Sequence, residues 1–394
     1  MTGPLNILEK LRRQFLWGGC DDKHKIKWVS WDKVMAPKKL GGLGAGSLLT
    51  LNLALMAKWW WRHKLDNSSL WSQVISSIHR LNDKPADYIS RKTNGGVWNN
   101  IAGAKKDIEK FGLRFYDILK KTVNSGTSTL FWLDEWIADG KLKDQFPNLY
   151  QIEQKKRCLV GERITDQGLE WDWACNTQQA GLSTMVAQLN AIVGNFSLGT
   201  TTDDWSCGLD ATGVFSISAV RTRMLTSGTN FMQDRVEWIK EAPMKVITFI
   251  WRAKMGRIPS SEALIKRGIP NIHSHCSHCN EVGTNCAFGK TTGHWIFRWC
   301  GIGDVVVNSV TELIEFAQSW GNSKKEGKLL TLVCYGMLWL MWLAINDRIF
   351  KQRIISPTLV ADNIKSLVFV WVKHRGVKKN IKWVDWNVSP FLCL

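Results

Sequence analysis

The chain has 394 residues, of which 45% are hydrophobic and 22% are charged. This composition excludes an intrinsically disordered chain, and the length allows two or three domains with sizeable cores. The 52 Lys and Arg residues against 34 Asp and Glu residues give a formal net charge of +18. Such an excess favours a polyanionic partner, either nucleic acid or an acidic membrane surface. A basic protein without a polyanionic partner is the alternative.

The N-terminal sequence MTGPLNILEKLRRQ has no apolar segment of the kind found in secretory signals. We therefore expect a protein that is nuclear or cytoplasmic and not secreted. In these compartments its ten Cys residues are expected to stay reduced.

The first residues of the chain predict helices separated by loops rich in Gly and Pro. Residues 5–17 have apolar side chains at helical spacing, and Ser47 is expected to cap a second, largely buried helix. Residues 26–34 (IKWVSWDKV) are expected to form a short strand. Residues 381–389 (IKWVDWNVS) nearly repeat this sequence, and we interpret the two copies as similar edge strands.

The middle of the chain is expected to be mixed. The segment FWLDEW is interpreted as the end of a strand in which Trp132 and Trp136 are buried, while Asp134 and Glu135 lie at the surface. Pro243 and Pro259 are then expected to separate three short helices.

Three further helices are expected toward the C-terminus, near 309–319, 329–345 and 357–374. Residues 329–345 are 17 uncharged residues, which is the short limit for a membrane span. Because Trp residues recur there at helical spacing, we interpret the segment as a buried core helix and expect no membrane partner.

Residues 275–300, HCSHCNEVGTNCAFGKTTGHWIFRWC, contain four Cys and three His. Zinc prefers four thiolate or imidazole ligands in a tetrahedron, and two Cys separated by two residues can reach one ion from a tight turn. The spacing therefore predicts a closed, structural zinc site formed by Cys276, Cys279, His294 and Cys300. The spare candidates, which we interpret as a solvent-exposed thiol and surface imidazoles, are Cys286, His273, His275 and His278.

Several motifs of the chain, taken in order, resemble the region downstream of the reverse transcriptase in plant LINE-type (non-LTR) retrotransposon polyproteins. These motifs are FLWGG at 15, WVSWDKV at 28, PKKLGGLGAGSL at 37, LNLALMAKWWWR at 51, FWLDEW at 131, FPNLY at 146, VFSISAVR at 214 and LWLMWLAINDRIF at 338. The residues that resemble the zinc-binding segment of that region are Trp251, Leu264, Arg267, Cys276, Cys279, Glu281, His294 and Cys300.

The resemblance implies a transposable-element origin and a reverse-transcriptase zinc-binding domain with one structural Zn²⁺. It implies template RNA or DNA as a partner, and an upstream reverse transcriptase domain in an intact polyprotein. One departure stands out, because 14 residues separate Cys279 from His294 where the family usually has only a handful. The sequence CAFGKTT is therefore interpreted as an insertion, which a loop can accommodate at little entropic cost.

No catalytic residues are predicted. The polymerase motif of reverse transcriptases is an aromatic residue, any residue, and Asp-Asp, which supplies carboxylates for two metal ions. The pairs at Asp21 and at Asp203 lack the aromatic residue, and we interpret them as solvated loop acids. The carboxylates of the C-terminal 100 residues have no strand pattern of the RNase H kind. A stand-alone polymerase or nuclease is the less favoured alternative, and a decayed remnant without activity is another.

Two segments carry basic residues in a pattern that suits nucleic acid, because cations contact phosphates while aromatic rings stack on bases. They are KWWWRHK at 58–64 and KHRGVKKNIK at 373–382. The candidate nucleic-acid-binding residues are Lys58, Arg62, Lys373, Arg375, Lys378, Lys379 and Lys382. The alternatives are a solvated tail and core packing of Trp59–Trp61.

The expected fold is mainly α with a few short β-strands (α+β), made of multi-helix units and a small zinc-binding module. We expect a Trp-rich helical region over 1–130, a mixed α/β region over 131–230, the zinc-binding domain over 231–350, and a helix with a basic tail over 351–394.

Overall fold

The computed structural model describes residues 2–18, 26–66, 68–79, 96–137, 140–165, 168–175, 180–226, 234–270, 275–277, 279, 286–303, 305–376 and 380–394. Contacts divide the chain into two units. Unit 1 contains Met1–Arg13 and Gly46–Thr229, and unit 2 contains Gln14–Ala45 and Asn230–Leu394. Unit 2 therefore joins a segment near the N-terminus to the C-terminal part of the chain, whereas the expected regions were consecutive.

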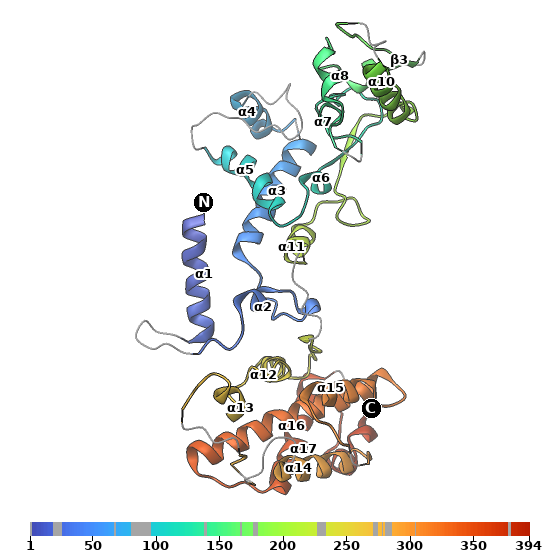
Figure 1. Ribbon diagram of the computed structural model, residues 1–394. Coiled ribbons are helices and arrows are strands. Elements are labelled where there is room, and N and C mark those ends of the chain that lie inside the picture. The colour runs from blue at the N-terminus through green and yellow to red at the C-terminus, as the bar shows by residue number, and fades with distance from the viewer. Residues whose placement is uncertain are drawn as a thin grey trace. The chain divides into compact units, whose positions relative to one another are not determined.

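The fold is mainly helical with a few short strands, as the sequence predicts (Figure 1). Helix α1 (Thr2–Trp17) begins in unit 1 and ends in unit 2. The other elements of unit 1 are α3 (Leu48–Leu65), α4 (Leu70–His79), α5 (Val97–Glu109), α6 (Phe115–Ile118), β1 (Lys120–Thr122), α7 (Leu142–Gln145), α8 (Pro147–Ile152), α9 (Val160–Arg163), β2 (Ile164–Thr165), β3 (Gly168–Leu169), α10 (Ala180–Val193), β4 (Asp204–Ser206) and α11 (Ile217–Thr226).

The predicted helix after Ser47 is confirmed as α3. The Ser47 hydroxyl accepts a hydrogen bond from the backbone N–H of Thr50 at 3.4 Å, which satisfies one of the unpaired donors at the helix start. Helix α3 packs against α5 and α11, and the core between them contains Trp60 and Trp61. Core packing is therefore confirmed for these two Trp residues, whereas Trp59 is 43% exposed.

A second core of unit 1 lies within residues 123–198 and is built around Phe131, Trp132 and Trp136, which confirms the predicted burial of the two Trp side chains. The strand expected at FWLDEW is not formed, because residues 131–134 form turns. The turns are stabilised locally, since the Trp136 indole N–H donates to the carbonyl of Phe131 at 2.9 Å.

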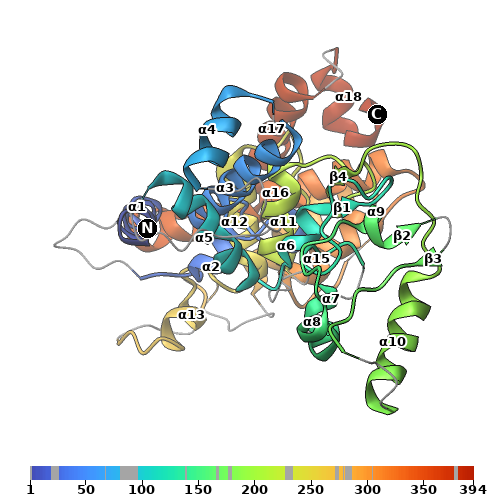
Figure 2. The same ribbon diagram turned by 90° about the horizontal axis from the view of Figure 1, so that it is seen from above.

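The strands of unit 1 form two antiparallel pairs, β1 with β4 and β2 with β3. In the first pair Lys121 lies opposite Trp205, and Figure 2 shows these two strands side by side. Residues in β4 are more than 80 positions from those in β1, so this pair brings together two distant stretches of the chain.

Unit 2 is helical in its described residues. Its helices are α2 (Trp31–Met35), α12 (Met244–Lys254), α13 (Ser261–Ile265), α14 (Ala287–Trp299), α15 (Val310–Ser319), α16 (Lys324–Lys351), α17 (Pro357–Arg375) and α18 (Trp383–Val388), with short 3-10 turns at Lys38–Leu40 and Pro390–Cys393. Pro243 precedes α12 and Pro259 precedes α13, as expected, whereas residues 235–239 are irregular rather than helical.

Helix α16 is the centre of unit 2. It contacts α12, α14, α15 and α17 (Figure 1), and it begins with a capping box in which Ser323 and Glu326 exchange hydrogen bonds. By length and composition α16 could cross a membrane, and 56% of its apolar window is buried inside unit 2. The large buried surface explains the run of apolar residues as core packing.

The two similar segments at 26–34 and 381–389 do not form strands. Each forms a short helix instead, α2 in the first copy and α18 in the second. In the second copy Trp386 is fully buried and its indole N–H donates to the carbonyl of Lys365 at 2.9 Å. The C-terminal segment after residue 350 therefore packs into the same core as α16 through α17 and α18, rather than forming a separate tail.

Candidate metal centre and basic surfaces

Three cysteines of unit 2 lie together. The Cys286 Sγ is 3.4 Å from the Cys276 Sγ and 3.5 Å from the Cys279 Sγ, and all three sulfur atoms lie within 4.8 Å of one another. Each side chain is half-buried. A disulfide needs a sulfur–sulfur distance of about 2.0 Å, so no disulfide joins Cys286 to either of the others, and the three sulfur atoms converge on one point.

The geometry suits a soft metal ion. In a tetrahedral site with zinc–sulfur bonds of about 2.3 Å, neighbouring sulfur atoms are about 3.8 Å apart, which is close to the separations found here. Burial and the neighbouring thiols raise the pKa of the Cys286 thiol to about 12, although the backbone N–H of Gly289 opposes this. A bound cation would reverse the effect by stabilising the thiolates.

Helix α14 explains why Cys286 is the third member of the group. Cys286 is the N-cap of this helix, and Ala287–Trp299 continue it without a break. At 1.5 Å per residue, His294 lies about 12 Å further along the helix and Cys300 about 21 Å. His294 is exposed, and neither it nor Cys300 belongs to the group that the described residues form.

Cys300 has a different environment. It is 3% exposed, belongs to the main core of unit 2, and lies near the buried Cys334. Burial raises its pKa far above the ordinary value for a thiol, which is typical of a structural cysteine in a core. The sequence CAFGKTT is therefore the start of a packed helix and not an inserted loop.

A signal for this helix was present in the sequence. Phe288, Thr292, Ile296 and Trp299 recur at intervals of three and four residues, and all four are buried in the structure. This periodicity predicts a helix that begins at Cys286, which makes that residue a candidate third ligand rather than an exposed thiol. Among the spare histidines, His275 is described and exposed, while His273 and His278 lie outside the described residues.

The basic candidates of unit 1 lie on the exposed side of α3. Lys58 and Arg62 are both exposed. The Arg62 guanidinium lies 5.2 Å from the ring centre of Trp59 and 5.7 Å from that of Trp71, and the two rings meet edge to face at 5.4 Å. Cations and a half-exposed indole are thus interleaved on one surface of unit 1, so the interpretation of core packing does not hold for Trp59. Nucleic-acid binding by Lys58 and Arg62 stays a prediction.

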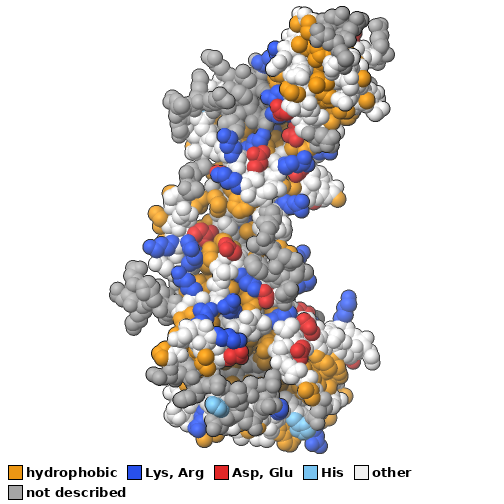
Figure 3. Space-filling model, viewed as in Figure 1, with side chains coloured by type: hydrophobic (Ala, Val, Ile, Leu, Met, Phe, Trp, Pro, Cys, Tyr) orange, Lys and Arg blue, Asp and Glu red, His pale blue; other side chains and the backbone are white. Residues whose placement is uncertain are grey.

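The basic candidates of unit 2 are near the end of α17 and the start of α18. Lys373 is half-buried and lies 5.3 Å from the ring centre of Phe369. Arg375 and Lys382 are exposed, and Arg375 also donates to the carbonyl of Glu241 at 3.4 Å. Lys378 and Lys379 lie outside the described residues. On the face in Figure 3, Lys and Arg side chains are spread over the surface and alternate with Asp and Glu.

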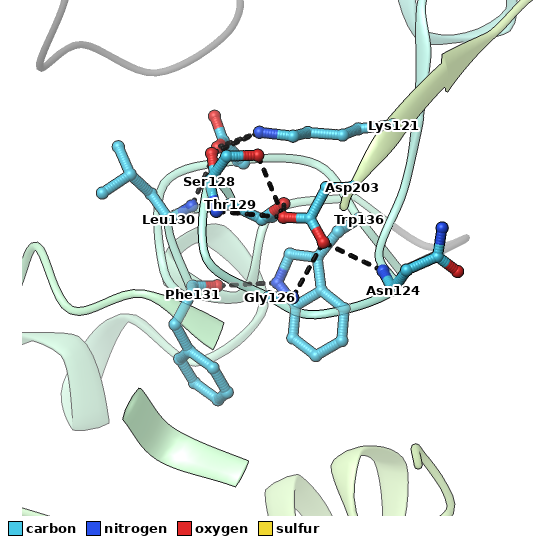
Figure 4. Close-up of polar contacts among 10 residues, drawn as sticks. Lys121, Asn124, Gly126, Ser128, Thr129, Leu130, Phe131, Trp136 and Asp203 are labelled. Carbon is cyan, nitrogen blue, oxygen red and sulfur yellow. Dashed lines mark hydrogen bonds and ion pairs between the residues drawn. The ribbon is translucent and has the colours of Figure 1, made fainter. Parts of the chain in front are cut away.

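Asp203 is not a solvated loop acid, contrary to expectation. Its carboxylate accepts hydrogen bonds from the backbone N–H groups of Asn124, Gly126 and Ser128 at 2.8–3.1 Å. The hydroxyls of Ser128 and Thr129 also donate to it (Figure 4). The carboxylate therefore holds the 124–129 loop, while the neighbouring Asp204 is exposed.

Asp134 is also buried, where a surface position was expected. It accepts a hydrogen bond from the backbone N–H of Leu130 at 2.9 Å and lies 3.9 Å from the Lys121 ammonium group. Lys121 is 7% exposed and donates to the carbonyl of Ser128 (Figure 4). Burial lowers the pKa of Lys121, although the nearby carboxylates of Asp134 and Asp203 oppose this. This network is a structural one, since both carboxylates accept hydrogen bonds from backbone N–H groups of residues 124–130.

Parts of this chain are similar in sequence to known proteins. Residues 215–288 match the family of zinc-binding segments in reverse transcriptase, and this range contains all three clustered cysteines and ends before His294. A protein of Arabidopsis thaliana named as a ribonuclease H protein is 28% identical over 256 residues, which cover 63% of this chain and 39% of that protein. The chain thus spans about two fifths of the length of this relative. No solved structure matches the chain.

A second relative is an uncharacterized mitochondrial protein of Arabidopsis thaliana. It is 30% identical over 127 residues, which cover 32% of this chain and 78% of that protein. Together with the match to the zinc-binding family, this agrees with the resemblance of the sequence motifs. The chain belongs to the plant retrotransposon polyproteins, as a region that includes the zinc-binding segment of reverse transcriptase.

Proposed function

We propose that this chain is a non-catalytic segment of a retrotransposon reverse transcriptase polyprotein, or of a host protein derived from one, that binds one structural Zn²⁺ and nucleic acid. The observation that carries the proposal is the group of three cysteine sulfur atoms inside the segment that matches the zinc-binding family. Zinc would hold the Cys276–Cys279 turn against the start of α14, because Cys286 is the N-cap of that helix. Its contribution would then be to folding.

The ligand set that the geometry supports is Cys276, Cys279 and Cys286. It replaces His294 and Cys300 of the sequence prediction by one cysteine, because the rigid α14 separates those two residues from the cluster. A tetrahedral ion needs one more ligand. His275, which precedes Cys276, and His278, which lies between Cys276 and Cys279 in the sequence, are the candidates for that position.

The test is a measurement of bound zinc in the full chain and in single variants. We expect about one zinc ion per chain in the unmodified protein, and we expect Cys276→Ser, Cys279→Ser and Cys286→Ser to lose it. His294→Ala and Cys300→Ala are the matched controls, and both should keep the metal. Zinc lost in Cys300→Ala and kept in Cys286→Ser would instead support the ligand set predicted from the sequence.

Nucleic-acid binding is supported by the net charge of +18 and by the exposed cations on α3 and at the end of α17. Counterion release makes such binding strongly dependent on salt. We expect the full chain to bind labelled RNA or DNA with an affinity that falls steeply between 50 and 200 mM salt, roughly 10-fold or more. An affinity that does not change with salt would contradict this part of the proposal.

A non-catalytic role is supported by the surroundings of Asp203. Its carboxylate is saturated by five hydrogen bonds from one loop, and a carboxylate that binds catalytic metal ions needs free oxygen lone pairs. A primer-extension assay with Mg²⁺ or Mn²⁺ tests this directly. Extension that depends on Asp203 and Asp204 would overturn the proposal, and a folded chain that binds neither zinc nor nucleic acid would be a retroelement remnant.

A further inference from the structure

Unit 2 contains a cavity of about 600 Å³ that neither the cysteine group nor the basic segments use. It lies between residues 16–17 and 26–43 on one side and helices α12 and α13 on the other, and its walls include Trp17, Trp28 and Trp251. Cavities of roughly 300–1,000 Å³ with apolar walls and a few polar groups are typical of ligand sites in proteins. This cavity has the volume and the aromatic lining of such a site.

Two of the indole rings are held in place by their own contacts. The Trp251 N–H donates to the carbonyl of Gly41 at 2.8 Å. The Arg267 guanidinium lies 4.4 Å from the ring centre of Trp28 and also donates to the carbonyl of that residue at 3.5 Å. The rings are therefore oriented before any ligand arrives, which lowers the entropic cost of binding.

The cavity is also positively charged. Arg252 lines it, and none of the other lining residues is Asp or Glu. Among the described residues, the Arg252 side chain donates one hydrogen bond, from its Nε to the carbonyl of Arg257 at 3.2 Å. Burial lowers the pKa of Arg252, which shows that the guanidinium has given up part of its hydration. An anionic group bound to the guanidinium would replace the hydration that it has lost.

We propose that this cavity binds an unpaired base of single-stranded nucleic acid, which packs against the indole of Trp28 while an adjoining phosphate binds Arg252. The inference rests on the nucleic-acid binding proposed above and assigns it a site. Aromatic rings that stack on bases beside cations that contact phosphates are the usual elements of single-strand recognition. A base inside a duplex cannot enter the cavity, because both of its faces are stacked.

The test compares the affinity of the zinc-loaded full chain for a fluorescein-labelled single-stranded RNA 12-mer and for the same sequence as a duplex, by fluorescence polarisation. Stacking on one aromatic residue accounts for roughly 5- to 150-fold in affinity. We therefore expect Trp28→Leu and Arg252→Gln each to weaken binding of the single strand by about this factor, with little effect on the duplex. Trp295→Leu, which changes a Trp that is 42% exposed on α14, is the control and should bind normally.

A second measurement excludes misfolding of the variants as the cause of weakened binding. Photo-crosslinking with a 4-thiouridine-containing 12-mer, followed by peptide mapping, should label the peptides of Trp28 or Trp17 in the unmodified chain. If both variants fold and bind the single strand as tightly as the unmodified chain does, the cavity proposal is overturned and the proposed function stays intact. Failure of the unmodified chain to bind any nucleic acid would overturn both. If the two variants lose binding of an apolar fluorescent probe but keep their affinity for RNA, the cavity binds an apolar ligand instead.

Discussion

The Asp203 carboxylate accepts a hydrogen bond from the backbone N–H of Gly126 at 2.8 Å, although the two residues are 77 positions apart in the chain. This contact joins the loop before FWLDEW to the strand β4, which follows Asp203 directly. Gly126 has a φ of 70°, a conformation that other residues adopt rarely. A Cβ at this position would also lie 2.4 Å from the backbone nitrogen of Gly161. The loop geometry therefore needs a glycine at position 126 as well as the carboxylate of Asp203.

Asp203→Asn should destabilise unit 1. The amide keeps the shape but removes the charge that five donors of the loop now share, and hydrogen bonds to charged groups contribute about 1.5–3 kcal/mol each. We expect a loss of about 2–3 kcal/mol in the free energy of unfolding, measured by urea denaturation. Asp204→Asn is the control, because Asp204 is exposed, and its effect should be about 0.5 kcal/mol or less. Equal effects of both changes would contradict this role of Asp203.

The ion pair of Glu153 and Arg163 should be far more sensitive to mutation than the surface pairs. The two groups are 2.5 Å apart, and both side chains are nearly fully buried. Arg163 also donates to the Cys158 sulfur at 3.1 Å and to the carbonyl of Glu170 at 2.6 Å. Glu153→Gln would leave the guanidinium buried without a counter-charge, which costs about 3–5 kcal/mol of stability.

Thermal or urea unfolding of Glu153→Gln measures this effect. The exposed pair of Glu262 and Lys266, 2.6 Å apart, provides the comparison. Because water and salt screen such a pair, Glu262→Gln should change the free energy of unfolding by about 1 kcal/mol or less. A small effect of Glu153→Gln would mean that the buried pair is not required for the second core of unit 1.

Lys58 and Arg62 should contribute to nucleic-acid affinity through charge. For single strands, each cation that binds a phosphate adds roughly 0.7 to the slope of log affinity against log salt concentration. Lys58→Gln combined with Arg62→Gln should therefore reduce that slope by about 1.4. Lys110→Gln is a suitable control, because Lys110 is exposed and already paired with Asp107 at 2.7 Å. An unchanged slope in the double variant would place the phosphate contacts elsewhere.

Several helices of this chain could be predicted from the sequence, because their boundaries depend on local signals. The cap at Ser47 and the apolar periodicity of α15, α16 and α17 are local, and the structure confirms them. The strand predictions at 26–34 and 381–389 were wrong for a non-local reason. Alternating Trp and Val side chains suit a strand and a short amphipathic helix equally well, and the burial of Trp386 against α17 decided between them.

The cysteine site could be predicted in part. The Cys276–Cys279 pair was identified from spacing, which is a local property of a turn. The third cysteine was missed, because spacing alone does not show whether the chain between two ligands is a loop or a rigid helix. The burial of Asp134 and the hydrogen bonds of the half-buried Asp203 were missed for a similar reason. A short polar sequence does not show which backbone N–H groups will converge on a carboxylate from 70 or more positions away.

His63 should make unit 1 less stable in mild acid. It is 3% exposed and its Nδ1 lies 2.8 Å from the Ser72 hydroxyl. Burial, with a smaller effect of Lys64, lowers its pKa from 6.5 to about 4. Between these two values the unfolded chain binds a proton that the folded chain does not, so protonation favours unfolding. The stability that depends on neutral His63 is therefore complete above pH 6.5 and is lost as the pH falls toward 4.

Urea unfolding at several pH values tests this, with His63→Gln as the variant. Gln can still accept a hydrogen bond from Ser72 but does not titrate. Between pH 7 and pH 5 we expect the unmodified chain to lose about 1–2 kcal/mol more stability than the variant, because one pKa unit corresponds to about 1.4 kcal/mol. His374→Gln, at an exposed position near the end of α17, should keep the pH dependence of the unmodified chain. If His63→Gln keeps it as well, a different group is responsible for the acid sensitivity of unit 1.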